Sequence, residues 1–300
     1  MQPLNVLIGP NGSGKSNLIE AINLLKALPS DVSVPFRSGG GIPEWLWKGV
    51  GRAIGSSGVG PDIQIDTVIS YSSAENELPL MHSVYLGSVS HQVVLLYESI
   101  TDRRKPVQDN IFFVRDIFDH GVSQLNVREN VMGADDTRPR QQRRLIRRED
   151  VGAQQSVLSQ IKDADQYPEI TYLGRVFSQI YVFRGTNLAH GSPLRGPQRA
   201  DEPSSFLSED GSNLGMVLND LLNQPQTKKR LLAELKRFYE PVEDITTRIH
   251  AGTVETFFHE RNFTQSVPSI RLSDGTLRYL CLLAILCHPT PPPLVCIEDP

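Results

Sequence analysis

The sequence predicts an α/β fold with a central mixed sheet, helices on its faces and an antiparallel β-lobe. Three observations lead to this prediction. A glycine-rich loop at 9–16 lies between an apolar run and a helical pattern. Apolar and polar residues alternate through much of 62–115, as they do in antiparallel strands. From 153 onward, helical and strand patterns follow one another, as in α/β domains.

Residues 9–16, Gly-Pro-Asn-Gly-Ser-Gly-Lys-Ser, match the phosphate-binding pattern G-x-x-x-x-G-K-[ST]. The apolar run 4–8 suits a buried parallel strand, and apolar residues at helical spacing fill 18–25. Glycines let the backbone wrap around phosphate, and a helix N-terminus adds positive charge. The motif therefore predicts that Lys15 reaches the β- and γ-phosphates of ATP and that Ser16 binds Mg²⁺. A plain glycine-rich turn with an exposed lysine is disfavoured by the strand–loop–helix context.

Two further segments near the C-terminal end fit the same chemistry. The apolar run 294–298 ends in Glu298, with Asp299 next, and adjacent carboxylates can hold Mg²⁺ and orient a water for phosphoryl transfer. Just upstream, Leu-Ser-Asp-Gly-Thr at 272–276 opens a predicted helix whose N-terminus offers a second anion site. The alternative interpretation of 272–287 is an amphipathic core helix with an ordinary serine or aspartate cap.

Together these motifs resemble the ABC-type ATPase heads of the SMC/RecF group. The sequence is most similar to the bacterial AAA-family "predicted ATPase" branch related to the OLD nucleases. Residues 9–17 resemble the Walker A motif of that branch, 272–278 its signature motif, and 298–300 the end of its Walker B motif. Residues 210–214 are similar to a segment that precedes the signature in the same branch. The resemblance covers both ends and much of 153–300.

The resemblance implies a P-loop NTPase of ABC-ATPase type that uses ATP and Mg²⁺. It places Glu298 at the metal-side acid and Asp299 at the catalytic base, where the usual residue is a longer glutamate. Ser273 and Gly275 would contact the γ-phosphate held by a second subunit, which implies an ATP-dependent homodimer. Either Gln155 or Gln160 would be the Q-loop glutamine. The nucleotide-binding residues so implied are Gly9, Asn11, Gly12, Ser13, Gly14, Lys15, Ser16, Asn17, Ser273 and Gly275.

We expect residues 1–30 and 151–300 to form the ATPase core, and 31–150 to form the β-lobe. The lobe would begin with a long loop rich in glycine, proline and serine at 30–60, where Trp45 and Trp47 either stack on a base or pack on the lobe. Predicted strands lie at 62–72, 79–87, 90–99 and 110–115. In the core, helices are predicted at 155–162, 168–179, 212–223 and 227–239, and strands at 180–184 and 242–258.

The arginine-rich stretch at 134–150 has acidic residues on both sides, which favours a solvated insertion over a contact with a phosphate backbone. The net charge of −4 gives no general attraction to nucleic acid, so DNA is an open but unindicated partner. Three cysteines without metal-ligand spacing indicate reduced core thiols in a cytoplasmic protein. We expect no membrane segment, because no apolar run is long enough to span a bilayer.

These observations predict ATP binding and hydrolysis by a head that dimerises around ATP, compatible with DNA repair or phage defence. One alternative is a nucleotide-gated scaffold with little turnover, which the order Glu298-Asp299 leaves open. Another is a different P-loop enzyme such as a small-molecule kinase, but kinases lack a signature turn before the acidic strand. The resemblance also implies that a whole head extends past both ends of this chain, so we expect this segment to turn over ATP slowly.

Overall fold

The computed structural model describes residues 4–46, 63–72, 77–89, 92–104, 111–116, 123–129, 140–146, 152, 154–185 and 192–298. For 38, 123, 126–129 and 140–146 it describes the backbone alone. The chain divides into two compact units, Met1–Ile180 (unit 1) and Tyr181–Pro300 (unit 2). The predicted division into an ATPase core and a β-lobe with a boundary near 150 stays a prediction.

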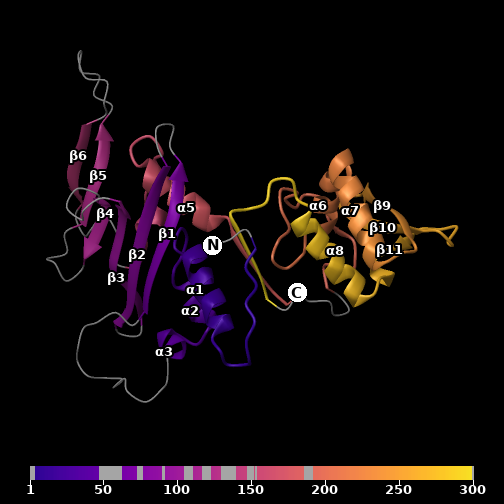
Figure 1. Ribbon diagram of the computed structural model, residues 1–300, viewed down its shortest axis with the longest axis horizontal. Helices are drawn as coiled ribbons and strands as arrows, with labels where there is room; N and C mark the ends of the chain where they lie inside the picture. The colour runs from indigo at the N-terminus through magenta and orange to yellow at the C-terminus, as the bar shows by residue number, and fades with distance from the viewer. Residues whose placement is uncertain are drawn as a thin grey trace, which may run out of the picture. The chain divides into compact units, whose positions relative to one another are not determined.

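Unit 1 contains a six-stranded antiparallel sheet in which the strands follow in chain order (Figure 1). The four predicted strands are confirmed, and their alternating pattern places apolar side chains on one face. Two further strands, β5 and β6, extend the sheet. No strand was predicted at β5, and β6 lies within 134–150, where we expected a solvated insertion. The strands are β1 Ile63–Ser72, β2 Glu77–Val89, β3 Gln92–Asp102, β4 Ile111–Asp116, β5 Ser123–Glu129 and β6 Arg140–Ile146.

The helices of unit 1 are short apart from the first and the last. The amphipathic helix predicted after the glycine-rich loop is confirmed, with Ile19, Ile22 and Leu25 buried. That helix, α1, packs against α2 and α5, and α5 also packs against β4 (Figure 1). The helices are α1 Lys15–Ala27, α2 Val34–Ser38, α3 Ile42–Trp45, α4 Val157–Gln160 and α5 Pro168–Ser178.

The described residues of unit 2 form three α-helices and a four-stranded antiparallel sheet, with a separate two-stranded sheet formed by β7 and β12. The predicted helices and strands of this part are confirmed, with ends shifted by a few residues. The elements are β7 Ile180–Arg184, β8 Gln198–Arg199, α6 Leu214–Leu222, α7 Pro225–Phe238, β9 Val242–His250, β10 Thr253–Glu260, β11 Val267–Pro268, a 3₁₀ turn Ser269–Arg271, α8 Asp274–Leu286 and β12 Leu294–Glu298.

The core of unit 2 forms where α6, α7 and α8 bury their apolar faces. Val217, Leu231 and Leu280 are fully buried there. Cys281 belongs to the same core, and burial raises the pKa of its thiol to about 12. A thiol held this far from its ionised form is an unreactive packing group, in agreement with the prediction of core cysteines.

Two local expectations are wrong. Residues 4–8 are not a buried strand, since Leu4 and Ile8 are 80% and 91% exposed and none of the described sheets includes them. An apolar run becomes a strand only where a neighbouring strand accepts its backbone hydrogen bonds. Within the expected loop at 30–60, the described residues 30–46 contain α2 and α3, and Trp45 packs against Phe36 with ring centroids 4.7 Å apart. Trp47 lies outside the described residues.

Candidate functional site

Two glycines of the glycine-rich loop have backbone angles that favour glycine. Gly12 and Gly14 have φ angles of +78° and +88°, a region that residues with a Cβ rarely adopt. Gly14 is the N-cap of α1, so the loop leads directly into the helix N-terminus. A side chain at Gly9 would also be obstructed, because its Cβ would lie 2.8 Å from Ser13 Oγ. The loop is therefore a turn that depends on its glycines and leads into α1.

Lys15 lies across this loop rather than pointing away from it. Its Nζ donates hydrogen bonds to the carbonyl oxygens of Gly9 (2.7 Å) and Pro10 (2.9 Å). These contacts hold a positive charge beside the turn and the positive end of the helix dipole. Asn11, Ser16 and Asn17 are exposed around it. The assignment of this loop to ATP, and of Ser16 to Mg²⁺, stays a prediction from the motif.

The signature turn, residues 272–276, forms the start of α8. Ser273 is the N-cap, and its Oγ accepts a hydrogen bond from Thr276 N (3.1 Å) and lies 2.8 Å from Thr276 Oγ1. Thr276 is buried, whereas Ser273 and Gly275 are exposed. Hydrogen bonds between Ser273 and the buried Thr276 thus hold the turn in place. The two residues predicted to contact phosphate, Ser273 and Gly275, face solvent.

Arg195 joins this turn from a distant loop. Its Nη1 donates to the carbonyl oxygen of Leu272 (2.9 Å), and its guanidinium pairs with the carboxylate of Asp274. Arg195 lies 79 residues before Asp274 in the chain, so no local sequence pattern joins the two residues.

Glu298 is the last residue of β12, as predicted, and its side chain is 29% exposed. Arg184 at the end of the neighbouring strand β7 has its Nε 4.0 Å from Glu298 Oε2. Glu298 also lines a cavity with Glu209 and with Arg278 of α8. The Nε of Arg278 is buried there without a hydrogen-bond partner among the described residues. Asp299, the predicted catalytic base, lies outside the residues that the structure describes.

The segment 210–214 is a structural turn. Asn213 Oδ1 accepts from Ser208 N (2.8 Å), and its Nδ2 donates to Phe206 O (2.9 Å), so this side chain ties the loop together instead of capping α6. Gly211 has φ +73°, and a Cβ there would lie 2.5 Å from the side chain of Leu194. These contacts explain the glycine and asparagine of the segment by packing alone.

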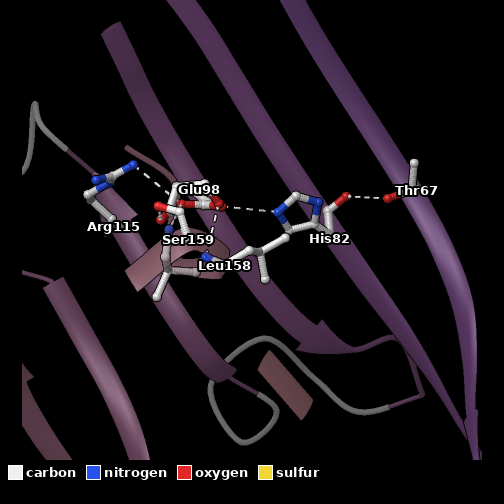
Figure 2. A network of polar contacts seen from close by, with 8 residues as sticks. Thr67, His82, Glu98, Arg115, Leu158 and Ser159 are labelled. Atoms are coloured by element: carbon white, nitrogen blue, oxygen red, sulfur yellow. Dashed lines mark hydrogen bonds and ion pairs between the residues drawn. The ribbon is translucent and has the colours of Figure 1, made fainter. Parts of the chain in front are cut away.

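A second cluster, the Glu98 node, lies inside unit 1 (Figure 2). Glu98 on β3 is fully buried and accepts hydrogen bonds from Ser156 Oγ (2.5 Å) and Val157 N (3.0 Å). His82 Nε2 and Arg115 Nη2 each lie 3.3 Å from its carboxylate. Burial alone would raise the pKa of Glu98, but the His82 hydrogen bond and the charge of Arg115 outweigh it and lower the pKa. The node therefore holds a buried negative charge that fastens α4 to the sheet.

Sequence reasoning missed this node, although a glutamate inside the apolar run of β3 was a signal for it. Ser156, which donates a hydrogen bond to Glu98, directly follows Gln155 in the chain, and Gln155 itself is exposed. Gln160 is half-buried, and its Nε2 has no hydrogen-bond partner among the described residues. The choice between them as the Q-loop glutamine stays open.

The predicted site residues therefore lie in both units. Unit 1 brings together Gly9, Gly12, Gly14, Lys15 and Ser16 in one loop. Unit 2 contains Ser273, Gly275 and Glu298, of which the first two share the start of α8 and the third lies at the end of β12. None of the described helices has both the length and the apolar composition that crossing a bilayer requires.

Comparison with known proteins gives a family. Residues 4–68 and 82–300 match the family described as "AAA domain, putative AbiEii toxin, Type IV TA system". A search of curated proteins finds no match. The match covers both the phosphate loop and the signature turn with the β12 strand, the segments on which the predicted P-loop fold depends. The chain therefore belongs to this AAA-domain family and is a P-loop ATPase head of the AAA/OLD-like type.

Proposed function

We propose that this chain binds ATP with Mg²⁺ at residues 9–16 and hydrolyses it, and that two copies pair around the bound nucleotide. The observation that carries the proposal is the phosphate loop. Gly12 and Gly14 in the left-handed region lead the loop into the start of α1, and the carbonyl oxygens of Gly9 and Pro10 hold the Lys15 ammonium beside them. Such a combination has a clear use in binding phosphate and little use in packing.

The residues of the site would divide the work of phosphoryl transfer. Lys15 and the loop amides stabilise negative charge on the β- and γ-phosphates, which is the main requirement of this reaction. Bound Mg²⁺ neutralises phosphate oxygens, and Ser16 with Glu298 are its proposed ligands. Asp299 is the proposed base that orients the attacking water.

Pairing follows from the exposed side of the signature turn. Ser273 and Gly275 face solvent at a helix N-terminus, where an anion is stabilised by the helix dipole. We assign that anion as the γ-phosphate of ATP bound to a second copy. The cycle of pairing and release is compatible with DNA repair or phage defence.

Turnover tests the enzymatic part. Steady-state phosphate release should depend on Mg²⁺ and fall to background in Lys15→Ala, because the charge facing the phosphates is lost. Lys26→Ala, in the last turn of the same helix, is the matched control and should retain the wild-type rate. Release that is equal in Lys15→Ala and wild type would exclude this loop as the site. ATP binding without any release would favour the scaffold alternative.

Pairing is tested by sedimentation with a non-hydrolysable ATP analogue. The wild type should shift from monomer to dimer when the analogue is added. Ser273→Arg should abolish the shift while nucleotide affinity stays unchanged, because the phosphate loop is intact. A wild type that stays monomeric at saturating analogue contradicts the pairing model.

A further inference from the structure

Arg195 contacts the residues on both sides of Ser273 in the chain. Its guanidinium donates to the carbonyl oxygen of Leu272 before the cap and pairs with the carboxylate of Asp274 after it. Its own carbonyl oxygen accepts a hydrogen bond from Ser269 Oγ (3.3 Å) in the preceding 3₁₀ turn. The Arg195 side chain is only 11% exposed, whereas that of Asp274 is 69% exposed. One arginine therefore lies beneath the exposed face of the signature turn.

The loop that carries Arg195 is itself held in place. Gln198 donates to the carbonyl oxygens of Pro193 and Gly211 (both 3.0 Å) and accepts from Gly215 N (2.5 Å). Leu194 is buried in the core of unit 2. Because the residues on both sides of Arg195 are held in place, its contact with the turn costs little additional conformational entropy.

The charge of Asp274 creates a difficulty that Arg195 resolves. An aspartate in the first turn stabilises α8 by interacting with the helix dipole. The same carboxylate stands beside Ser273 and Gly275, where it would repel a triphosphate. A guanidinium paired with it cancels that repulsion and leaves the helix N-terminus free to attract an anion.

We propose that Arg195 is the positioning residue of the signature turn and that it neutralises Asp274, so that the start of α8 can accept the triphosphate held by a second copy. This inference rests on the proposed function. It adds that the affinity of pairing depends on the sum of two charges in one subunit, Arg195 and Asp274, rather than on the serine and glycine alone.

The test is a double-mutant cycle on the affinity of pairing, measured by sedimentation with the non-hydrolysable ATP analogue. Arg195→Gln keeps a donor for the Leu272 carbonyl but exposes the Asp274 charge, so pairing should weaken about tenfold. Adding Asp274→Asn to that variant should restore most of the loss. A merely structural role would not give this rescue, because Asp274→Asn restores none of the contacts that Arg195→Gln has lost. Higher salt should reduce the defect of Arg195→Gln, since it screens the repulsion.

Two further variants complete the design. Asp274→Asn alone leaves Arg195 without its counter-charge, so pairing should tighten and become more salt-dependent. This variant tests the neutralisation of Asp274 by Arg195 even if Arg195→Gln fails to fold. Arg199→Gln is the matched control, because Arg199 pairs with Asp201 at the surface and should leave pairing unchanged.

The possible failures are distinguishable. A wild type that never pairs overturns the proposed function and this inference with it. A wild type that pairs, together with an Asp274→Asn substitution that neither rescues Arg195→Gln nor tightens pairing by itself, overturns only the role of Arg195.

Discussion

Two carboxylate–arginine pairs of this protein differ in what surrounds them. Glu98 and Arg115 in unit 1 have side chains that are 0% and 5% exposed, while Asp274 beside Arg195 in unit 2 is 69% exposed. Each pair lies next to a serine that caps a helix: Ser156 caps α4 and Ser273 caps α8. The local arrangement is the same, but of these two pairs only Arg195–Asp274 has a carboxylate that is exposed enough to contact a ligand.

The comparison teaches that burial separates a pair that stabilises the interior from a pair whose carboxylate is open to solvent. A buried carboxylate is kept in place by every partner it has, and removing one leaves an uncompensated charge in the interior. A pair at the surface contributes little to stability, since water and salt screen it. Its contacts can therefore change when an anion arrives, without loss of the fold.

The largest expected effect is that of Glu98→Ala. It leaves Arg115 and His82 buried without their acceptor, so the free energy of unfolding of unit 1 should fall by about 3–5 kcal/mol. Both tryptophans of the chain lie in unit 1, so urea unfolding followed by tryptophan fluorescence reports this unit. Asp274→Ala is the counterpart, and hydrogen exchange of α8 amides should detect a change of about 1 kcal/mol or less. Equal effects would remove the distinction between the two pairs.

The two capping serines sharpen the comparison. Ser156→Ala removes a cap and also a hydrogen bond to the buried Glu98 carboxylate, so it should cost about 2–3 kcal/mol. Ser273→Ala removes a capping hydrogen bond of the same length at the surface and should lower the free energy of unfolding by about 1 kcal/mol. The opposite order is expected for pairing in the presence of nucleotide: Ser273→Ala should weaken pairing, and Ser156→Ala should not. A Ser156→Ala variant as stable as Ser273→Ala would show that the node contributes nothing beyond capping.

The smallest expected effect is a pH dependence. The pKa of Glu98 is lowered in the folded protein, so the unfolded chain binds more protons in acid. The stability that Glu98 contributes is therefore complete above its ordinary pKa near 4.5 and is lost as the pH falls through the lower folded value. Each pH unit between the two values is worth about 1.4 kcal/mol. Urea unfolding of wild type and Glu98→Gln from neutral to acidic pH should show a steeper loss for wild type; parallel curves would contradict the lowered pKa.

The fold was predictable where local patterns are strong. Alternation identified β1 to β4, and helical spacing identified α1 and α8. The same reasoning missed β5 and β6. Arg140, Arg143 and Arg144 of β6 are typical of solvated segments, and the two strands exist through pairing with each other. It also misread 4–8, where an apolar run has no strand partner among the described residues.

The candidate site was predictable in parts. The residues of the phosphate loop and the signature turn were visible from their motifs, because the chemistry requires those residues next to one another in sequence. Arg184 beside Glu298 and Arg195 beside Asp274 were not, because these contacts join positions far apart in the chain. A single sequence gives no information on which distant residues meet.

The most direct test of the central claim is a calorimetric titration of the protein with ATP and Mg²⁺. The account predicts saturable binding to wild type and to Lys26→Ala, and a loss of affinity of at least about tenfold in Lys15→Ala, because one charge-assisted contact to the phosphates is worth more than about 1.4 kcal/mol in a partly desolvated site. Arg195→Gln should bind ATP as the wild type does, since its effect is confined to pairing. Equal affinity of wild type and Lys15→Ala, or no binding to the wild type, would contradict the account.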